Sequence, residues 1–170
     1  MPKLVFNFKS KDTKKIKNPK NILGGKGANL SEMGRMGLPV PPGFTISTEV
    51  CDLFYKNKKK LKPKIINEIN KELKNIEKDS GKKFGDLKNP LLLSVRSGAR
   101  VSMPGMMDTV LNLGLNEESL NGLANKTQNE WFALDTYRRF ISMFSGNMNV
   151  NKQLASKKSD LYFKDDKWFL

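Results

Sequence analysis

The spacing of apolar residues in the first half of the chain predicts one strand followed by three helices. Residues 3–8 alternate enough to form a short strand, and the lysine-rich segment that follows is expected to be an exposed connection. Apolar residues at helical spacing predict helices within residues 26–37, 47–57 and 61–81. The first is about three turns long, because Gly37 and three prolines follow its last apolar position.

Individual residues mark the ends and faces of the two later helices. Thr48 is a candidate N-cap, since its hydroxyl can accept a hydrogen bond from an unpaired N–H group of the first turn. In residues 61–81 the apolar stripe of a surface helix consists of Ile65, Ile69, Leu73 and Ile76. Gly81 is expected to end that helix, because glycine adopts the left-handed conformation that often follows a last turn.

The second half of the chain mixes strand and helix patterns. The run LLLSV, residues 91–95, is typical of a strand buried in a sheet, and residues 109–114 predict a second strand. The loop between the two strands contains Gly98, Pro104 and Gly105. A helix within residues 129–144 is expected to pack in the core through one face, made of Ala133, Tyr137, Phe140, Ile141 and Phe144. The chain as a whole is predicted to be α+β.

Composition limits the chemistry that the chain can perform. It contains no histidine, which removes the commonest general base, the commonest metal ligand and any phosphohistidine. Its single cysteine, Cys51, excludes an internal disulfide and is expected to be a small buried apolar residue. No apolar run is long enough to cross a membrane, and the N-terminus lacks the pattern of a signal peptide. We therefore expect a cytoplasmic protein with no membrane partner.

Charge favours anionic ligands without defining one. The chain has 31 lysines and arginines against 17 acidic residues, a formal net charge of +14. A nucleic-acid-binding surface is one interpretation. A solvated lysine face is the interpretation we favour, because the lysine-rich segments contain no interleaved aromatic residues for base stacking. We expect no specific nucleic-acid partner.

The sequence GGKG, residues 24–27, sets a lysine among glycines where a helix is expected to begin. A helix N-terminus offers unpaired N–H groups and the positive end of the helix dipole, so an anion is stabilised there. Lys26 adds a mobile positive charge, and the glycines allow close approach to the backbone. The P-loop pattern is excluded, because Gly27 follows the lysine where serine or threonine is required. An exposed lysine in a glycine-rich turn is the alternative.

A second cluster strengthens the phosphate interpretation. Arg96 ends the apolar run, and Arg100 follows it after a Ser-Gly-Ala turn. A guanidinium group offers a planar fork of donors that matches two phosphate oxygens and keeps its charge at any working pH. A lone arginine is more often half of a surface ion pair. Two arginines in a glycine-containing loop, together with GGKG, favour a polyphosphate ligand.

Three stretches of the sequence resemble one enzyme family. They are LGGKGANLSEMGRMGLPVPPGFTISTEVC, LLLSVRSGARVSMPGMMDTVLNLGLN and WFALDTYRRFISMF. Together they resemble the N-terminal nucleotide-binding region of the pyruvate, phosphate dikinase family over about residues 4–144. The stretch SVRSGARVSMPGMMDT is especially specific, because phosphoenolpyruvate synthases resemble it only through the first arginine and its flanking serines.

The resemblance implies the first subdomain of an ATP-grasp type domain, which holds ATP between two α+β subdomains. It implies that Lys26, Arg96 and Arg100 bind the phosphates of ATP, and that Ser102–Thr109 form a loop near those phosphates. The family interconverts ATP, phosphate and pyruvate with AMP, pyrophosphate and phosphoenolpyruvate. It carries the phosphoryl group on a histidine of a separate domain, and its Mg²⁺ ligands lie in the second half of the ATP site. Neither that histidine nor those ligands are expected in this chain.

These expectations define two domains and two alternative functions. Residues 1–144 are predicted to be a partial ATP-binding domain, and residues 145–170 a divergent tail of the kind that a truncation or frameshift produces. The favoured function is the ATP-binding portion of a dikinase, which is inactive alone and which a partner chain with the missing domains could complete. The alternative is a non-catalytic module that binds nucleotides or polyanions, including a basic nucleic-acid binder.

Overall fold

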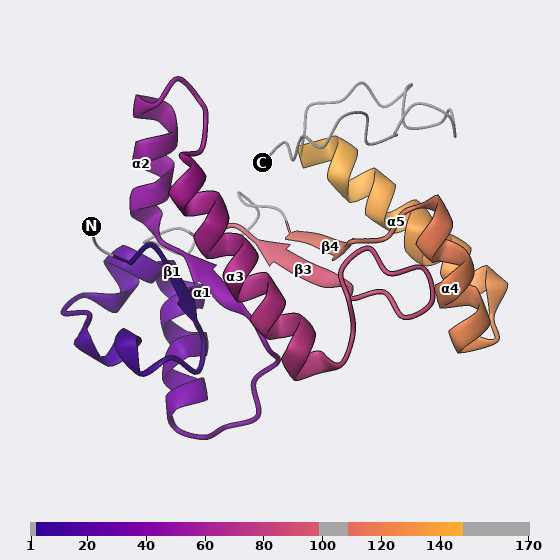
Figure 1. The fold of residues 1–170 in the computed structure, drawn as a ribbon, viewed down its shortest axis with the longest axis horizontal. Coiled ribbons are helices and arrows are strands. Elements are labelled where there is room, and N and C mark those ends of the chain that lie inside the picture. The colour runs from indigo at the N-terminus through magenta and orange to yellow at the C-terminus, as the bar shows by residue number, and fades with distance from the viewer. Residues whose placement is uncertain (1–2, 99–108, 148–170) are drawn as a thin grey trace. The chain divides into compact units, whose positions relative to one another are not determined.

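The computed structural model describes residues 3–98 and 109–147, which form an α+β chain with two compact units. The first unit comprises described residues 3–83 and 97–98, and the second comprises 84–96 and 109–147. Figure 1 labels most of their elements. In chain order these are β1 (Val5–Asn7), η1 (Lys11–Lys15), α1 (Pro19–Arg35), β2 (Phe44–Ile46), α2 (Thr48–Lys56), α3 (Pro63–Ser80), β3 (Leu93–Arg96), β4 (Thr109–Leu113), α4 (Glu117–Thr127) and α5 (Glu130–Asn147).

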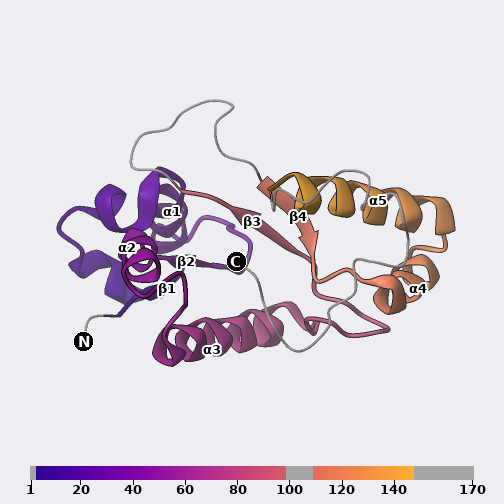
Figure 2. The ribbon, with the colours of Figure 1, turned by 90° about the horizontal axis from the view of Figure 1, so that it is seen from above.

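The first unit is built on a short antiparallel sheet between two helices. Strand β1 pairs with β2, and Phe6 stands opposite Thr45. Figure 2 shows α1 and α3 on opposite sides of these strands. One apolar cluster joins Phe6 to Leu23 and Ala28 of α1. The other cluster consists of Leu4, Val50 and Ile65. A two-stranded sheet is marginal by itself, so the packing of helices on both faces stabilises it.

Two carboxylates of α3 hold that helix against β1. Glu68 Oε2 accepts hydrogen bonds from the backbone N–H groups of Leu4, at 3.0 Å, and Val5, at 3.3 Å. One turn later, Glu72 Oε2 accepts from the side-chain amide of Asn7 at 3.3 Å. Hydrogen bonds from N–H groups to a charged acceptor are stronger than those between neutral groups. The polar residues of α3 therefore contribute to its packing as well as the apolar stripe.

The described helices of the first unit confirm most of the pattern. Ile65 and Ile76 are buried, and α3 ends at Gly81, whose φ of 65° is left-handed, as the sequence predicted. Most residues of the segment after β1 are exposed, as predicted, but the segment is not all irregular. That segment contains η1, whose Thr13 is buried and donates a hydrogen bond from Oγ1 to the carbonyl of Ser10. Ser10 caps this helical turn by accepting a hydrogen bond from the backbone N–H of Asp12. The many lysines of the segment gave no apolar pattern from which the turn could be predicted.

The assignment of Thr48 as N-cap was wrong. Ser47 is the cap residue and Thr48 is the first residue of α2. The Thr48 hydroxyl instead donates to the carbonyl of Asn21 at 2.6 Å, which links α2 to α1. The Thr48 hydroxyl therefore bonds to a residue distant in sequence, and it does not cap the helix to which the local sequence pattern had assigned it.

The second unit consists of a β-hairpin, α4 and α5. Strands β3 and β4 are antiparallel, with a register irregularity between Leu93 and Val95. Helix α5 packs against β4 and α4, and its Ala133 and Phe140 are buried, as predicted from their shared face. Helix α4 was not predicted from the sequence. It begins with a capping box in which Asn116 and Ser119 bond each other's backbone N–H groups.

The prediction that LLLSV is a buried strand was wrong for most of its length. Leu91 is buried, but it precedes the strand, and Ser94, Val95 and Arg96 of β3 are exposed. The hairpin has two strands, and it is β4 that α5 contacts. The apolar run therefore enters the core only at its start. Within the described residues, no helix is both long and apolar enough to cross a membrane.

Candidate functional site

The glycine-rich motif interrupts a helix and starts a new one. Helix α1 is continuous in outline, but Gly24 inside it has φ 69° and ψ 168°, which no helical residue adopts. This region of backbone space is essentially restricted to glycine. The residues after Gly24 therefore begin a fresh helical segment of about three turns, as the sequence predicted. Its first N–H groups lack an acceptor one turn earlier in the same segment, which is the arrangement that favours an anion.

Lys26 lies in the first turn of this new segment and is exposed. Its neighbour Gly27 is buried and has a different role from the one that the sequence suggested. A Cβ atom on Gly27 would lie 2.7 Å from Thr45 Oγ1 and 2.9 Å from Thr45 Cγ2. Gly27 therefore allows α1 to pack on β2 and does not itself clear a path for a ligand. Gly24 sets the backbone direction, and Lys26 supplies the charge.

The segment after Arg96 returns to the glycine-rich motif. A Cβ atom on Gly98 would lie 3.8 Å from the carbonyl oxygen of Leu23 and 3.9 Å from Gly24 Cα. These three residues belong to the first unit. The fold thus brings Gly98 to the point where α1 is broken, although Gly98 follows Gly24 by 74 positions in the sequence. The sequence alone contains no signal for this approach.

The structure locates the predicted arginines only in part. Arg96 is the last residue of β3 and is exposed. Arg100 lies outside the described residues, as does the loop from Ser102 up to Thr109, which itself begins β4. The part of the chain that the structure describes also corrects the reading of Cys51, which is exposed on α2. The apolar face of α2 is formed by Val50 and Leu53 instead, and they pack against the cluster around Leu4.

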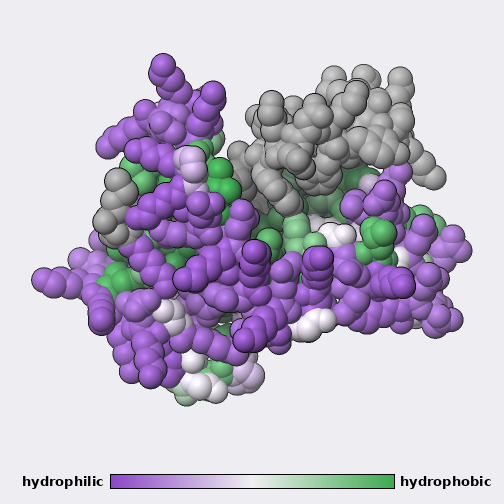
Figure 3. Space-filling model, viewed as in Figure 1, coloured by the Kyte–Doolittle hydropathy of each residue, from purple (hydrophilic) through white to green (hydrophobic). Residues whose placement is uncertain are grey.

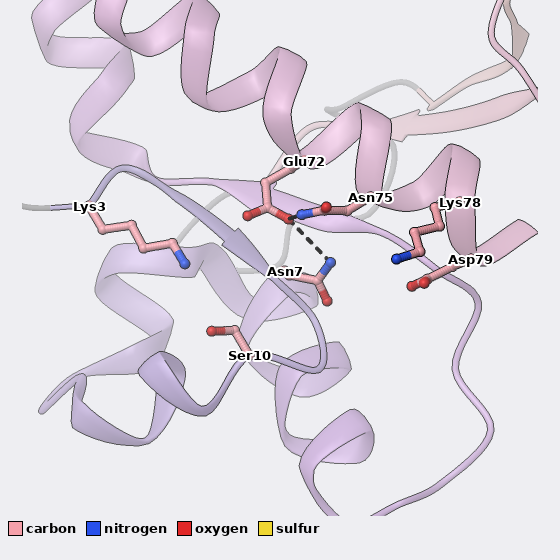
Figure 4. Close-up of a pocket in the computed structure, with 7 residues that line it drawn as sticks. All are labelled: Lys3, Asn7, Ser10, Glu72, Asn75, Lys78 and Asp79. Carbon is pink, nitrogen blue, oxygen red and sulfur yellow. Dashed lines mark hydrogen bonds between the residues drawn. The ribbon is translucent and has the colours of Figure 1, made fainter.

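A separate polar hollow of about 320 Å³ lies between α3 and the start of the chain (Figure 4). Its lining residues are Lys3, Asn7, Ser10, Glu72, Asn75, Lys78 and Asp79. Glu72 is largely buried and accepts from the side-chain amides of Asn7 and Asn75. Lys3 is ion-paired with Asp12 at 2.9 Å. The Asn7–Glu72 hydrogen bond joins α3 to β1, and the Lys3–Asp12 ion pair joins the residues before β1 to η1. Neither Lys26 nor Arg96 lines this hollow.

Among residues 3–98 and 109–147, no three His, Cys, Asp or Glu side chains gather in a way that could hold a metal ion. The described cationic and glycine-rich groups suit a phosphate-bearing ligand and do not form a divalent-cation site. Lys26 and the N–H groups of a helix start are chemically suited to an anion.

Known proteins are similar to this chain in sequence. A family model described as "Pyruvate phosphate dikinase, AMP/ATP-binding domain" matches residues 20–82, which include Lys26 and end before Arg96. The chain is 50% identical over 145 residues to the pyruvate, phosphate dikinase of Clostridium symbiosum, which is 85% of this chain and 16% of that protein. It is 55% identical over 158 residues to the chloroplastic enzyme of Flaveria pringlei, 92% of this chain and 16% of the relative. The enzyme of Rickettsia typhi is 50% identical over 175 aligned residues, covering 98% of this chain and 20% of the relative.

The glycine-broken helix lies in a segment that is similar to a nucleotide-binding domain. Residues 20–82 match the model of the pyruvate phosphate dikinase AMP/ATP-binding domain, and most of the chain is similar to the N-terminal segment of pyruvate, phosphate dikinases. The predicted resemblance is confirmed. The chain spans between about a sixth and a fifth of the length of these relatives.

Proposed function

We propose that this chain forms the first subdomain of an ATP-grasp type site, in which Lys26, Arg96 and Arg100 bind the phosphates of ATP. The observation that carries the proposal is the approach of Gly98 to Gly24. Arg96 precedes Gly98 by two residues, so their Cα atoms are at most about 7.6 Å apart. The proposal therefore rests on the turn at Gly24. Lys26 follows this turn by two residues, and Gly98, two residues after Arg96, lies beside it.

The proposed lysine and arginines would make different kinds of contact with a polyphosphate. Lys26 supplies a compact charge on a flexible stem beside the N–H groups of the new helix start. The guanidinium groups of Arg96 and Arg100 supply bidentate contacts that orient a phosphate. Phosphoryl transfer needs positioning and neutralisation of charge more than covalent chemistry by the protein. These side chains are suited to both tasks.

We extend the proposal to the activity that the relatives' names state. A complete enzyme containing this segment would form phosphoenolpyruvate, AMP and pyrophosphate from pyruvate, ATP and phosphate. The phosphohistidine would lie outside this chain, which has no histidine. Mg²⁺ ligands would also come from elsewhere, so we assign no step of the reaction to a metal held here. A partner chain with the remaining segments, a domain limit at residue 144 with a distinct tail at 145–170, and a cytoplasmic location stay predictions.

The experiment is an ATP titration of the purified chain by isothermal calorimetry at low salt. We expect weak binding, because half of a two-sided site leaves one face of the nucleotide in water. Lys26→Ala should weaken it about tenfold, the loss of one charge-assisted contact. Lys20→Ala is the matched control, since Lys20 is an exposed lysine of α1 before the break. Equal affinity of the Lys26→Ala variant and the parent would overturn the assignment.

A further inference from the structure

The turn between α2 and α3 has a higher density of positive charge than the chain as a whole. Residues 56–64, which we call the lysine segment, contain no acidic residue and six lysines. All six are exposed: Lys56, Lys58, Lys59, Lys60, Lys62 and Lys64. Within the described part of the chain, one ion pair involves this segment, and it joins Lys64 Nζ to Glu68 at the long distance of 4.0 Å. The segment therefore presents a nearly uncompensated positive potential to solvent.

The backbone holds these lysines in a defined turn. Lys58 and Lys59 have φ values of 54° and 57°, both left-handed. The N–H group of Lys59 donates to the carbonyl of Phe54 at 2.9 Å, and the side-chain amide of Asn57 donates to the carbonyl of Lys60 at 2.8 Å. Glycine or asparagine would adopt two successive left-handed positions with less strain. The presence of lysine at both is explained more readily by a use for the charge than by the needs of the turn.

An aromatic ring lies directly beside this charge. Tyr55, the residue before the lysine segment, is 64% exposed. Its ring meets the edge of Phe54 at a centroid distance of 5.6 Å, so a neighbouring side chain supports it. Figure 3 shows hydrophilic side chains covering the upper end of α2 and the turn above it. Exposed aromatic rings next to lysines are the combination that binds unpaired bases and their phosphates together.

We propose that the lysine segment and Tyr55 bind single-stranded nucleic acid, through its phosphates and through stacking of a base, without reading its sequence. The inference is independent of the proposed ATP site, because it uses none of the residues assigned to ATP. A single strand is favoured over a duplex, because a base inside a duplex is stacked between its neighbours and has no free face for Tyr55. A flexible phosphate chain also suits lysine, whose point charge imposes no fixed geometry.

The test is fluorescence anisotropy with a labelled random-sequence DNA oligonucleotide of about 20 nucleotides, titrated with the full chain at three salt concentrations. The variant Lys58→Ser/Lys59→Ser/Lys60→Ser removes three charges from the lysine segment. Its matched control, Lys11→Ser/Lys14→Ser/Lys15→Ser, removes three exposed lysines from η1 and leaves the same net charge. We expect the first variant to bind at least about tenfold more weakly at low salt, and its salt slope to fall by about 2, the value for three lost contacts to a single strand.

Two further variants separate this proposal from general basicity and from misfolding. Lys58→Gly/Lys59→Gly should bind more weakly while unfolding at a higher temperature, because glycine relieves the left-handed strain. Tyr55→Ala should weaken single-strand binding about fivefold or more and leave duplex binding unchanged. Equal losses in the two triple-serine variants would show that scattered charge suffices and would overturn the proposal. Equal affinity for duplex and single strand, or a stronger response to anionic vesicles or an acidic peptide, would also overturn it.

Discussion

Gly27 of α1 packs against Thr45 of β2 so closely that a methyl group has no room between them. A Cβ at this position would stand 2.7 Å from Thr45 Oγ1 and 3.3 Å from Leu23 Cβ. Because Thr45 is paired with Phe6 in the sheet, it cannot move aside without disturbing β1. The contact fixes the helix that carries Lys26 against the sheet.

Gly27→Ala should therefore lower the free energy of unfolding by about 1–3 kcal/mol, the usual cost of overpacking. Urea unfolding followed by circular dichroism measures it. Asn29→Ala, an exposed change on the same helix, is the control and should have little effect. Thr45→Ala should recover part of the loss when combined with Gly27→Ala, because the clashing atoms are removed. Additive effects of the two substitutions would contradict the close contact.

Gly122→Ala should destabilise the second unit more strongly than Gly81→Ala destabilises the first. A Cβ on Gly122 would overlap the backbone carbonyl of Leu87, which cannot rotate away as a side chain can. We expect a loss of about 3 kcal/mol or more. Gly81 is left-handed with nothing within 4 Å of its added Cβ, so Gly81→Ala should cost only about 1–2 kcal/mol. Thermal unfolding of both variants provides the comparison.

Acid should weaken the second unit through Asp135. Hydrogen bonds from Arg138, at 2.8 Å, and from Arg139, at 2.7 Å, hold the pKa of this carboxyl below its usual value, although partial burial opposes them. A lowered pKa in the folded state stabilises the protein above the unfolded-state pKa of about 3.9, and the contribution disappears as the pH falls through the folded-state value.

The measurement is unfolding of the parent and Asp135→Asn between pH 7 and pH 2. Asp135→Asn should be less stable than the parent at pH 7, and the difference should shrink below about pH 4. Asp12→Asn is a parallel case in the first unit, where Lys3 lowers the carboxyl pKa. A gap between parent and Asp135→Asn that stays constant over the whole range would refute the role of the charge.

Arg96 is expected to contribute mainly to the transition state of phosphoryl transfer. In a complete dikinase containing this segment, Arg96→Ala should lower kcat/KM by the equivalent of at least ~2 kcal/mol. Arg96→Lys should also be impaired, because lysine lacks the bidentate fork. Steady-state kinetics with ATP as the varied substrate test both. Activity within about threefold of the parent would argue against the assignment.

The chain alone should form no phosphoenolpyruvate. It contains no histidine to carry a phosphoryl group, whatever its affinity for ATP. The assay supplies ATP, phosphate and pyruvate to the pure chain and detects phosphoenolpyruvate, with a complete dikinase as the positive control. Product formed in proportion to the amount of pure chain would show that another residue accepts the phosphoryl group.

The ATP assignment and the lysine segment can be tested against each other. Lys26→Ala and Arg96→Ala should weaken ATP binding and leave oligonucleotide binding almost unchanged, whereas the triple serine variant of the lysine segment should do the reverse. Paired titrations with ATP and a random oligonucleotide at two salt concentrations are sufficient. Oligonucleotide binding that is tight at physiological salt, with no ATP binding by the parent, would favour the basic module over the dikinase segment.

The sequence by itself determined the features that depend on neighbouring residues. The apolar stripe from Ile65 to Ile76 defined α3, and Gly81 defined its end, because both follow from helical geometry and local backbone freedom. The position of Lys26 at the start of a new helical segment followed from the glycines around it. The motifs around Lys26 and Arg96 also carried the resemblance to pyruvate, phosphate dikinases, which the comparisons confirm.

Only the tertiary structure decided which distant residues meet. Gly27 looked like part of a ligand turn, yet its absent Cβ makes room for Thr45. Thr48 had the side chain of an N-cap, but the carbonyl of Asn21 was a better-placed acceptor. The approach of Gly98 to Gly24 joins two motifs that no local pattern connects. Such contacts depend on how helices and strands pack in three dimensions. The spacing of apolar residues along the sequence does not identify the distant residue that each side chain contacts.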